Sequence, residues 1–178
     1  MISEIAQLGA NVLRLQAQIV ADSQSAETKQ LIATLQDTLT STQGVGMAAP
    51  QIGVSKRLII IASRPTLRYP SAPLMEPTVM INPAFQPLSD TKEKDWEGCL
   101  SIPGIRALVP RYTEIAVSYT DQQGGFVETR LEGFVARVFQ HEFDHLEGTV
   151  YLDRVETNRD IYAESEYFKI CGVAAGDA

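Results

Sequence analysis

Apolar residues recur with a helical period in two stretches of the chain. From Glu27 to Leu39 they are three or four residues apart, which predicts a helix with one buried stripe made by Leu31, Ile32, Leu35 and Leu39. The stretch from Phe134 to Leu146 predicts a second helix of the same kind. Two amphipathic helices are therefore expected, about a hundred residues apart in the sequence.

Shorter apolar runs between these helices predict strands. Arg57–Ala62 ("RLIIIA") is rich in β-branched residues and is expected to be a buried strand, and Thr78–Pro83 ("TVMINP") another. Glu114–Thr120 and Phe126–Leu131 are joined by a short polar connection, which indicates a β-hairpin.

Two segments are expected to be irregular. Ser63–Pro77 contains four prolines, so we expect an extended surface loop there. The tail after about residue 158 could begin as a helix, but its end, "CGVAAGDA", is expected to fray, so we expect a loosely ordered tail. Because the sequence has no internal repeat, residues 1–178 are expected to form a single α+β domain.

Composition and charge exclude several classes of protein. The chain is 44% apolar and 21% charged, as ordinary globular proteins are, and its net charge of −7 argues against direct binding of DNA. The longest apolar run, Leu58 to Ala62, is too short to span a membrane, and residues 1–20 lack the features of a signal peptide. Two cysteines fit a reducing cytoplasm better than a disulfide framework.

Both histidines of the chain lie in the second predicted helix, within "QHEFDH". His141 and His145 are four residues apart, and they continue the apolar stripe of Phe134 and Val138. Burying two imidazoles is costly unless something compensates them, and a divalent metal between them does so, with Glu142 beside it as a proton carrier. So short a pattern also occurs by chance. The alternative to a metal site is therefore that the two histidines lie in an exposed helix that is rich in acids.

A metal site of this kind needs a third protein ligand, and the sequence offers several. Glu156 and Glu164 stand downstream at possible distances, as in common metallopeptidases. Upstream, Cys99 in "WEGCLSIPG" would give a Cys-His-His set with the fourth position open to water, which is the geometry of a catalytic site. A lone cysteine is otherwise usually a small buried apolar residue.

The segment Gly44–Gly53, "GVGMAAPQIG", is rich in glycine. It satisfies the G-x-G-x-x-A pattern of dinucleotide-binding proteins, but a predicted helix precedes it where that fold requires a strand, and Pro50 interrupts the helix that should follow. Either the glycines let the backbone approach a ligand to which Gln51 offers its amide, or the segment is a tight turn.

Taken together, "GVGMAAPQIG", "EGCLS" and "QHEFDH" resemble the peptide deformylase family in their order and spacing. The resemblance extends from about Leu8 to Asp153. It implies an α+β fold with mixed or antiparallel sheets around a central metal-binding helix. It also implies a hydrolase that removes the formyl group from the N-terminal formylmethionine of new polypeptides and releases formate.

The resemblance also implies roles for individual residues. One divalent metal per chain would be held by Cys99, His141 and His145; ferrous iron is the expected native metal, and zinc, nickel or cobalt can occupy such a site. Glu142 would be the general base and acid. Gln51 and the backbone N–H of Leu100 would donate hydrogen bonds to the oxyanion.

The expected substrate is an N-formylmethionyl nascent chain. The glycines Gly44 and Gly46 and the backbone of Glu97 and Gly98 would hold the peptide as an added strand. The methionine pocket would be lined by Val45, Phe134, Val138 and His141. Arg106 would contact the peptide backbone, or else form a surface ion pair. We expect a cytoplasmic protein without membrane contact, of bacterial origin first, with phage or organellar origin as alternatives. Transient ribosome contact stays open, but the net acidic tail argues against docking through the tail.

The carboxylate of Glu97 has no role in this chemistry, so we expect it to pair with an arginine. The candidates are Arg111, which the family pattern favours, and Arg137. Two other functions are possible in principle: a general metallopeptidase with a downstream third ligand, and a non-catalytic domain stabilised by a closed metal site. Turnover of formyl-Met-Ala distinguishes all three.

Overall fold

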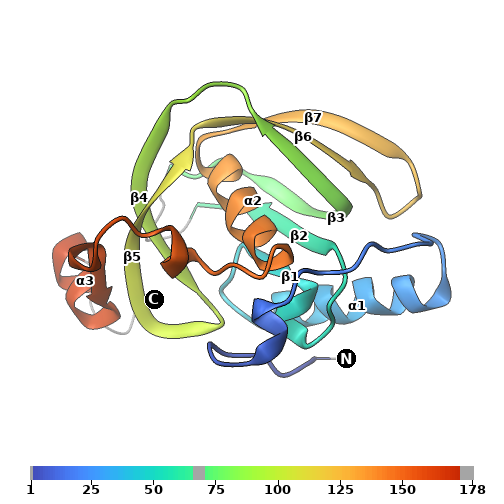
Figure 1. Ribbon diagram of the computed structural model, residues 1–178, viewed down its shortest axis with the longest axis horizontal. Coiled ribbons are helices and arrows are strands. Elements are labelled where there is room, and N and C mark those ends of the chain that lie inside the picture. Colours follow the sequence, from blue (N-terminus) through green and yellow to red (C-terminus); the bar gives the residue numbers. More distant parts are fainter. Residues whose placement is uncertain (1, 66–70, 173–178) are drawn as a thin grey trace.

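The computed structural model describes residues 2–65 and 71–172 and has two antiparallel sheets (Figure 1). The larger sheet has five strands in the order β1-β2-β3-β6-β7, and the smaller has three in the order β4-β5-β8. The strands of the two sheets are β1 (Gly46–Ala48), β2 (Leu58–Ser63), β3 (Met75–Pro87), β4 (Lys92–Cys99), β5 (Ile102–Tyr112), β6 (Glu114–Thr120), β7 (Phe126–Glu132) and β8 (Ile161–Ala163). Its α-helices are α1 (Ala26–Thr40), α2 (Gly133–Leu146) and α3 (Glu164–Cys171), and its short 3-10 helices are η1 (Asn11–Arg14), η2 (Ala49–Ile52), η3 (Tyr151–Arg154) and η4 (Asn158–Asp160). The predicted α+β fold class is confirmed.

The five-stranded sheet is covered by a helix on each face. Successive residues of β2 point to opposite faces. Ile59 and Ile61 belong to the core that includes α2, whereas Leu58 and Ile60 belong to the core that includes α1. Burial on both faces explains why this strand is a continuous apolar run and does not alternate with polar residues.

Helix α2 lies at the centre of the fold and is the element that carries the two histidines (Figure 1). It begins at Gly133, whose φ of 55° lies in the left-handed region that favours glycine. Its apolar side, which includes Val135, Val138 and Phe139, packs against the five-stranded sheet. The helix is buried almost all round, because the smaller sheet closes over its polar side. Both predicted long helices and the predicted hairpin β6–β7 are confirmed.

The structure describes most of the two segments that are expected to be irregular. The tail after about residue 158 contains β8, which pairs with β5, and then helix α3, whereas residues 173–178, which belong to the end that is expected to fray, lie outside the described residues. The aromatic rings of Tyr162 and Tyr167 meet Trp96 of β4 edge-on, and this apolar contact fixes the segment. The predicted surface loop at 63–77 is shorter than expected, because Ser63 ends β2 and Met75 begins β3; its residues 66–70 lie outside the described residues.

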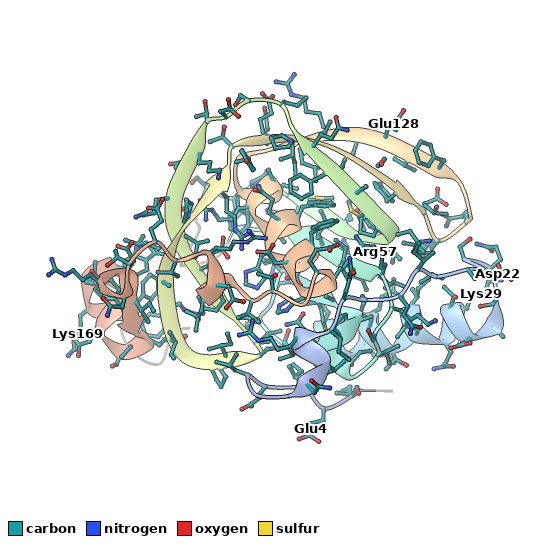
Figure 2. The ribbon with its side chains drawn as sticks, viewed as in Figure 1. Glu4, Asp22, Lys29, Arg57, Glu128 and Lys169 are labelled. Atoms are coloured by element: carbon teal, nitrogen blue, oxygen red, sulfur yellow. The ribbon has the colours of Figure 1, made fainter. Side chains whose placement is uncertain are left out.

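Charged side chains lie mainly at the periphery, as Figure 2 shows for Glu4, Lys29, Glu128 and Lys169. Arg57 is an exception: it reaches the C-terminal end of α2, with its Nη1 2.5 Å from Glu147 Oε1. None of the helices among the described residues combines the length and the apolar character needed to cross a membrane.

Candidate active site

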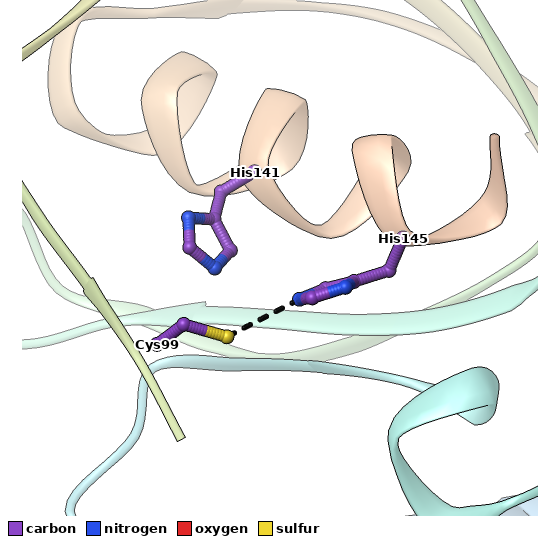
Figure 3. A group of neighbouring side chains, drawn as sticks. All are labelled: Cys99, His141 and His145. Carbon is purple, nitrogen blue, oxygen red and sulfur yellow. Dashed lines mark hydrogen bonds between the residues drawn. The ribbon is translucent and has the colours of Figure 1, made fainter. Parts of the chain in front are cut away.

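Three potential metal ligands converge between α2 and the end of β4 (Figure 3). His141 and His145 project from the same side of α2, as their four-residue spacing predicts, and Cys99 faces them from the last position of β4. The donor atoms of the three residues lie within 4.8 Å of one another, and Cys99 Sγ is 3.3 Å from His145 Nε2. All three residues are buried.

Glu97 fixes the orientation of the His141 ring. Its Oε2 lies 2.8 Å from His141 Nδ1. Tyr151 also contacts this imidazole, because its ring stacks on that of His141 at 5.8 Å between centroids. In the neutral ring that a metal requires, an Nδ1–H that donates to this carboxylate leaves the lone pair on Nε2, the nitrogen on the side of Cys99.

The Glu97 carboxylate is itself held by two arginines. Arg111 contacts both of its oxygens, through Nε at 2.8 Å and Nη2 at 2.9 Å, and Arg137 Nη1 lies 3.0 Å from Oε1. Arg111 is thus the bidentate partner that the family pattern favours, and Arg137 pairs with Glu97 as well. Burial alone would raise the pKa of Glu97, but the charge of Arg111 outweighs it and the pKa is well below its usual range.

The charges in the cluster favour a thiolate at Cys99 beside a protonated imidazole at His141. Burial opposes ionisation of Cys99, but the two imidazoles outweigh it and hold the pKa of its thiol well below the usual value. Burial likewise opposes the charged form of His141, but hydrogen bonds to Cys99 and Glu97 raise its pKa well above the usual value. Metal ligands must be deprotonated, so a bound cation would replace the imidazole proton beside this thiolate.

Glu142, next to His141 on α2, is a buried carboxylate at the pocket surface. Burial raises its pKa to about 7. Its Oε2 is buried and has no hydrogen-bond partner among the described residues. Gly46 of β1 leaves the space for it: a Cβ at position 46 would overlap Oε1 and lie 2.7 Å from Cγ. A carboxyl group that titrates near neutral pH suits proton transfer.

Gln51 directs its amide N–H groups at the cluster. Its Oε1 accepts a hydrogen bond from the backbone N–H of Ala48 at 2.8 Å, so its Nε2 points the other way. There Nε2 lies 3.5 Å from Cys99 Sγ and 3.2 Å from Ser101 Oγ. The amide is therefore oriented before any substrate binds, as a preorganised hydrogen-bond donor should be.

An open pocket of about 610 Å³ leads to this cluster, and thirteen of the fourteen residues predicted for the site line it. They are Gly44, Val45, Gly46, Gln51, Glu97, Gly98, Cys99, Leu100, Arg106, Phe134, Val138, His141 and Glu142. His145, 1% exposed, lies behind this lining. Arg106 forms an ion pair with Glu164, and it also lines the pocket. The expected ion pair and the expected contact with the peptide backbone are therefore compatible.

The sequence reasoning missed several residues of the site. Ser101 anchors Gln51, and Asp144 accepts a hydrogen bond from Arg111 Nη1 at 2.6 Å. Both stand inside the motifs "EGCLS" and "QHEFDH", so the motifs themselves were a signal. Tyr167 also lines the pocket, and no motif includes it. Glu164, which the sequence offered only as an alternative metal ligand, lines the pocket as well.

The donor set fits a divalent metal. One thiolate and two imidazoles suit iron, zinc, cobalt or nickel, and three protein ligands are typical of catalytic sites, whereas structural sites have four. No other such group of donors occurs within residues 2–65 and 71–172. Glu156 and Glu164, the alternative third ligands, pair instead with Lys94 and Arg106. With a proton-carrying acid beside it, this site defines the class of metal-dependent hydrolases.

Comparison with known proteins identifies the family within that class. The family model for polypeptide deformylase matches residues 2–160, and the chain belongs to this family. It is 52% identical to peptide deformylase 2 of Nostoc sp., over 92% of this chain and 91% of that protein. It is 46% identical to peptide deformylase 2 of Ralstonia nicotianae, over 88% of each chain.

Solved structures support the same family assignment. A class I type b peptide deformylase from Acinetobacter baumannii, with Met-Ala-Ser bound, superposes with a TM-score of 0.84 at 41% identity, over 87% of this chain and 99% of that chain. A peptide deformylase from Synechococcus elongatus in complex with actinonin has a TM-score of 0.78 at 35% identity, over 99% of this chain and 89% of that one.

Proposed function

We propose that this protein removes the N-formyl group from the formylmethionine of newly synthesised polypeptides and releases formate. The observation that carries the proposal is the convergence of Cys99, His141 and His145 beside Glu142 at the inner end of an open pocket. Family membership supports the same reaction. A general metallopeptidase would need a third ligand downstream of the helix, and a closed structural site would need a fourth; within the described residues neither is at the cluster.

Cys99, His141 and His145 would hold one metal per chain, and we propose ferrous iron as the native ion, with zinc, nickel or cobalt as substitutes. When bound, a divalent cation supplies Lewis acidity, which makes a water molecule a better nucleophile at neutral pH. Glu97 supports the site by orienting His141 and by balancing charge in the buried cluster.

Glu142 is assigned the proton transfers. Its pKa of about 7 lets it accept a proton from the attacking water and donate one to the amine that leaves. As water adds to the formyl carbon, negative charge develops on the formyl oxygen. The Nε2–H groups of Gln51 and the backbone N–H of Leu100 are the proposed donors to that oxygen, each contributing about 10²–10³ in rate.

The sheet edges suggest how the peptide binds. Strand β1 ends one sheet and β4 ends the other, and both line the pocket, through Gly46 and through Glu97 and Gly98. An extended peptide laid along these edges would form backbone hydrogen bonds as an added strand. The apolar side chains of Val45, Phe134 and Val138 are the proposed methionine pocket. Apart from its oxygen and the amide nitrogen, the formyl carbon bears only a hydrogen atom. The formyl group can therefore enter a space that excludes larger acyl groups.

We place this activity in the cytoplasm, where nascent chains are made. Contact with the ribosome is a further possibility for the enzyme. The described part of the tail offers little support for it, because its bases, Arg159 and Lys169, are outnumbered by its acids, Asp160, Glu164 and Glu166. Lys169 is moreover paired with Glu166.

The decisive experiment is turnover of formyl-Met-Ala by the purified protein, with metal content measured on the same sample. Glu142→Gln should keep the metal and lower the rate about 10²–10⁴-fold, because it removes only the proton carrier. His145→Ala should lose both the metal and the activity. A fully active Glu142→Gln protein would contradict the mechanism. Metal that stays bound after Cys99→Ala, with cleavage of internal peptide bonds, would favour a metallopeptidase instead.

A further inference from the structure

Strand β8 and helix α3, here called the C-terminal segment (residues 161–171), form part of the pocket wall. The match to the family model ends at residue 160, so the segment lies just beyond it. In Figure 1, α3 lies beside β4 and β5, on the side away from α2. Trp96 of β4 holds it through edge-on ring contacts with Tyr162 and Tyr167, each 4.9 Å between centroids. Tyr167 is 2% exposed, so the segment is firmly docked.

Glu164, the first residue of α3, pairs with Arg106 inside the pocket. Its Oε2 lies 2.5 Å from Arg106 Nη2. The side chains are only 30% and 13% exposed, and both line the pocket. Opposite charges in such a partly buried place attract more strongly than on the open surface, because water screens them less.

The pair places the Arg106 guanidinium directly over Gly98. A Cβ at position 98 would overlap Nη1 and lie 2.9 Å from Cδ of Arg106. The guanidinium also lies over the ring of Tyr167, at 5.9 Å from Cζ to the ring centroid. Gly98 precedes the ligand Cys99, so the guanidinium lies on the strand edge that borders the metal cluster.

We propose that Glu164 is a positioning residue that holds Arg106 for the backbone of peptides longer than formylmethionine. The inference rests on the proposed function, in which the edge of β4 at Glu97 and Gly98 pairs with the substrate. Arginine has many rotamers, and fixing one in advance reduces the entropy lost on binding. Through Glu164 the C-terminal segment thereby contributes to the binding of the peptide beyond its formylmethionine.

The experiment compares two uncharged substrates, formyl-Met-amide and formyl-Met-Ala-Ser-amide. Glu164→Gln keeps the size of the side chain and removes its charge. It should raise KM for the longer substrate about tenfold with kcat preserved, and change KM for the shorter one less than about twofold. In the Arg106→Gln background the same change should have no further effect, since Glu164 acts through Arg106. Glu164→Asp should recover part of the lost affinity.

Glu166→Gln is the matched control, because Glu166 is on the same helix but pairs with Lys169 at 56% exposure. It should leave both substrates unaffected, and thermal unfolding of each variant checks that the fold is kept. An equal loss on both substrates, or additive losses with Arg106→Gln, would overturn the inference while leaving the proposed function intact. A wild-type protein inactive on both substrates would overturn the two together.

Discussion

At position 46 the absence of a side chain makes room for the carboxylate of Glu142. The two residues come from β1 and α2, far apart in the sequence, and meet at the pocket surface. A methyl group at this position would overlap Oε1 and approach Cγ and Cδ of Glu142 at 2.7 and 2.8 Å. Glycine is therefore required here by close approach, not by a special backbone conformation.

Gly46→Ala should lower kcat by about 10²-fold or more, because the displaced carboxylate can no longer transfer protons in line with the reacting groups. Metal content should stay at the wild-type level, since Glu142 is not a ligand. Steady-state kinetics with formyl-Met-Ala and metal analysis test this. Gly44→Ala is the comparison. The added methyl group would lie 3.0 Å from the end of the flexible Leu100 side chain, so kcat should fall less than in Gly46→Ala. Equal losses would contradict the explanation.

The roles of single residues could be read from the sequence where a motif fixes their spacing. His141 and His145 had to share one side of α2 because of the helical period, and the structure places them so. Cys99 remained one of three possible ligands until the motifs were considered together, because nothing in local sequence specifies a distant partner. Ser101 and Asp144 were passed over because their contacts, Gln51 and Arg111, are long-range.

At the scale of elements, α2 is unusual in burying charged residues. Arg137, Glu142 and Asp144 are all buried along it. Arg137 donates to the backbone carbonyls of Val109 and Glu93 at 2.7 and 2.6 Å, so its charge is spread over the smaller sheet. A buried charge without partners would be very costly. The helix can bury Arg137 and Asp144 beside the candidate metal site because β4 and β5 supply these partners.

The Glu97–Arg111 pair tests this dependence. Glu97→Ala should cost about 3–5 kcal/mol, because it leaves Arg111 and Arg137 buried with fewer partners. Since both residues belong to one network, the losses of Glu97→Ala and Arg111→Ala should not be additive in the double variant. Denaturant unfolding measures all three. Glu166→Ala, which removes an exposed pair, should cost under about 1 kcal/mol; additive losses would mean that Glu97 and Arg111 act independently.

Elements held mainly by long-range contacts escaped sequence-based prediction. Strand β4 is rich in Lys, Glu and Asp, and β5 contains two prolines and a glycine, residues that are depleted in strands. They pair with each other and cover α2, which no local pattern reveals. Strand β8 and helix α3 depend on the ring of Trp96, more than sixty residues away in the sequence. Helices α1 and α2 and the hairpin β6–β7 were predictable because their own periodicity buries them.

At the scale of the whole molecule, the candidate metal site joins two halves of the fold. Both histidines lie on α2, which packs against the five-stranded sheet, whereas Cys99 ends a strand of the three-stranded sheet. The pocket runs between these halves, so it interrupts their apolar packing. A cation shared by Cys99, His141 and His145 would therefore hold the sheets together as well as serve the reaction.

Removal of the metal should destabilise the folded protein, since a ligand that binds only the folded state stabilises it by about 2.7 kcal/mol at a hundred times its Kd. For a chain of 178 residues we expect the Tm to fall by about 5–10 °C after chelation. Thermal unfolding with and without chelator, at the same protein concentration, measures the shift, and added ferrous or zinc ion should restore it. His145→Ala lacks a ligand, so its Tm should not respond to chelator. A wild-type Tm that is equally unresponsive while metal analysis shows that the ion is gone would mean that the site does not link the two halves.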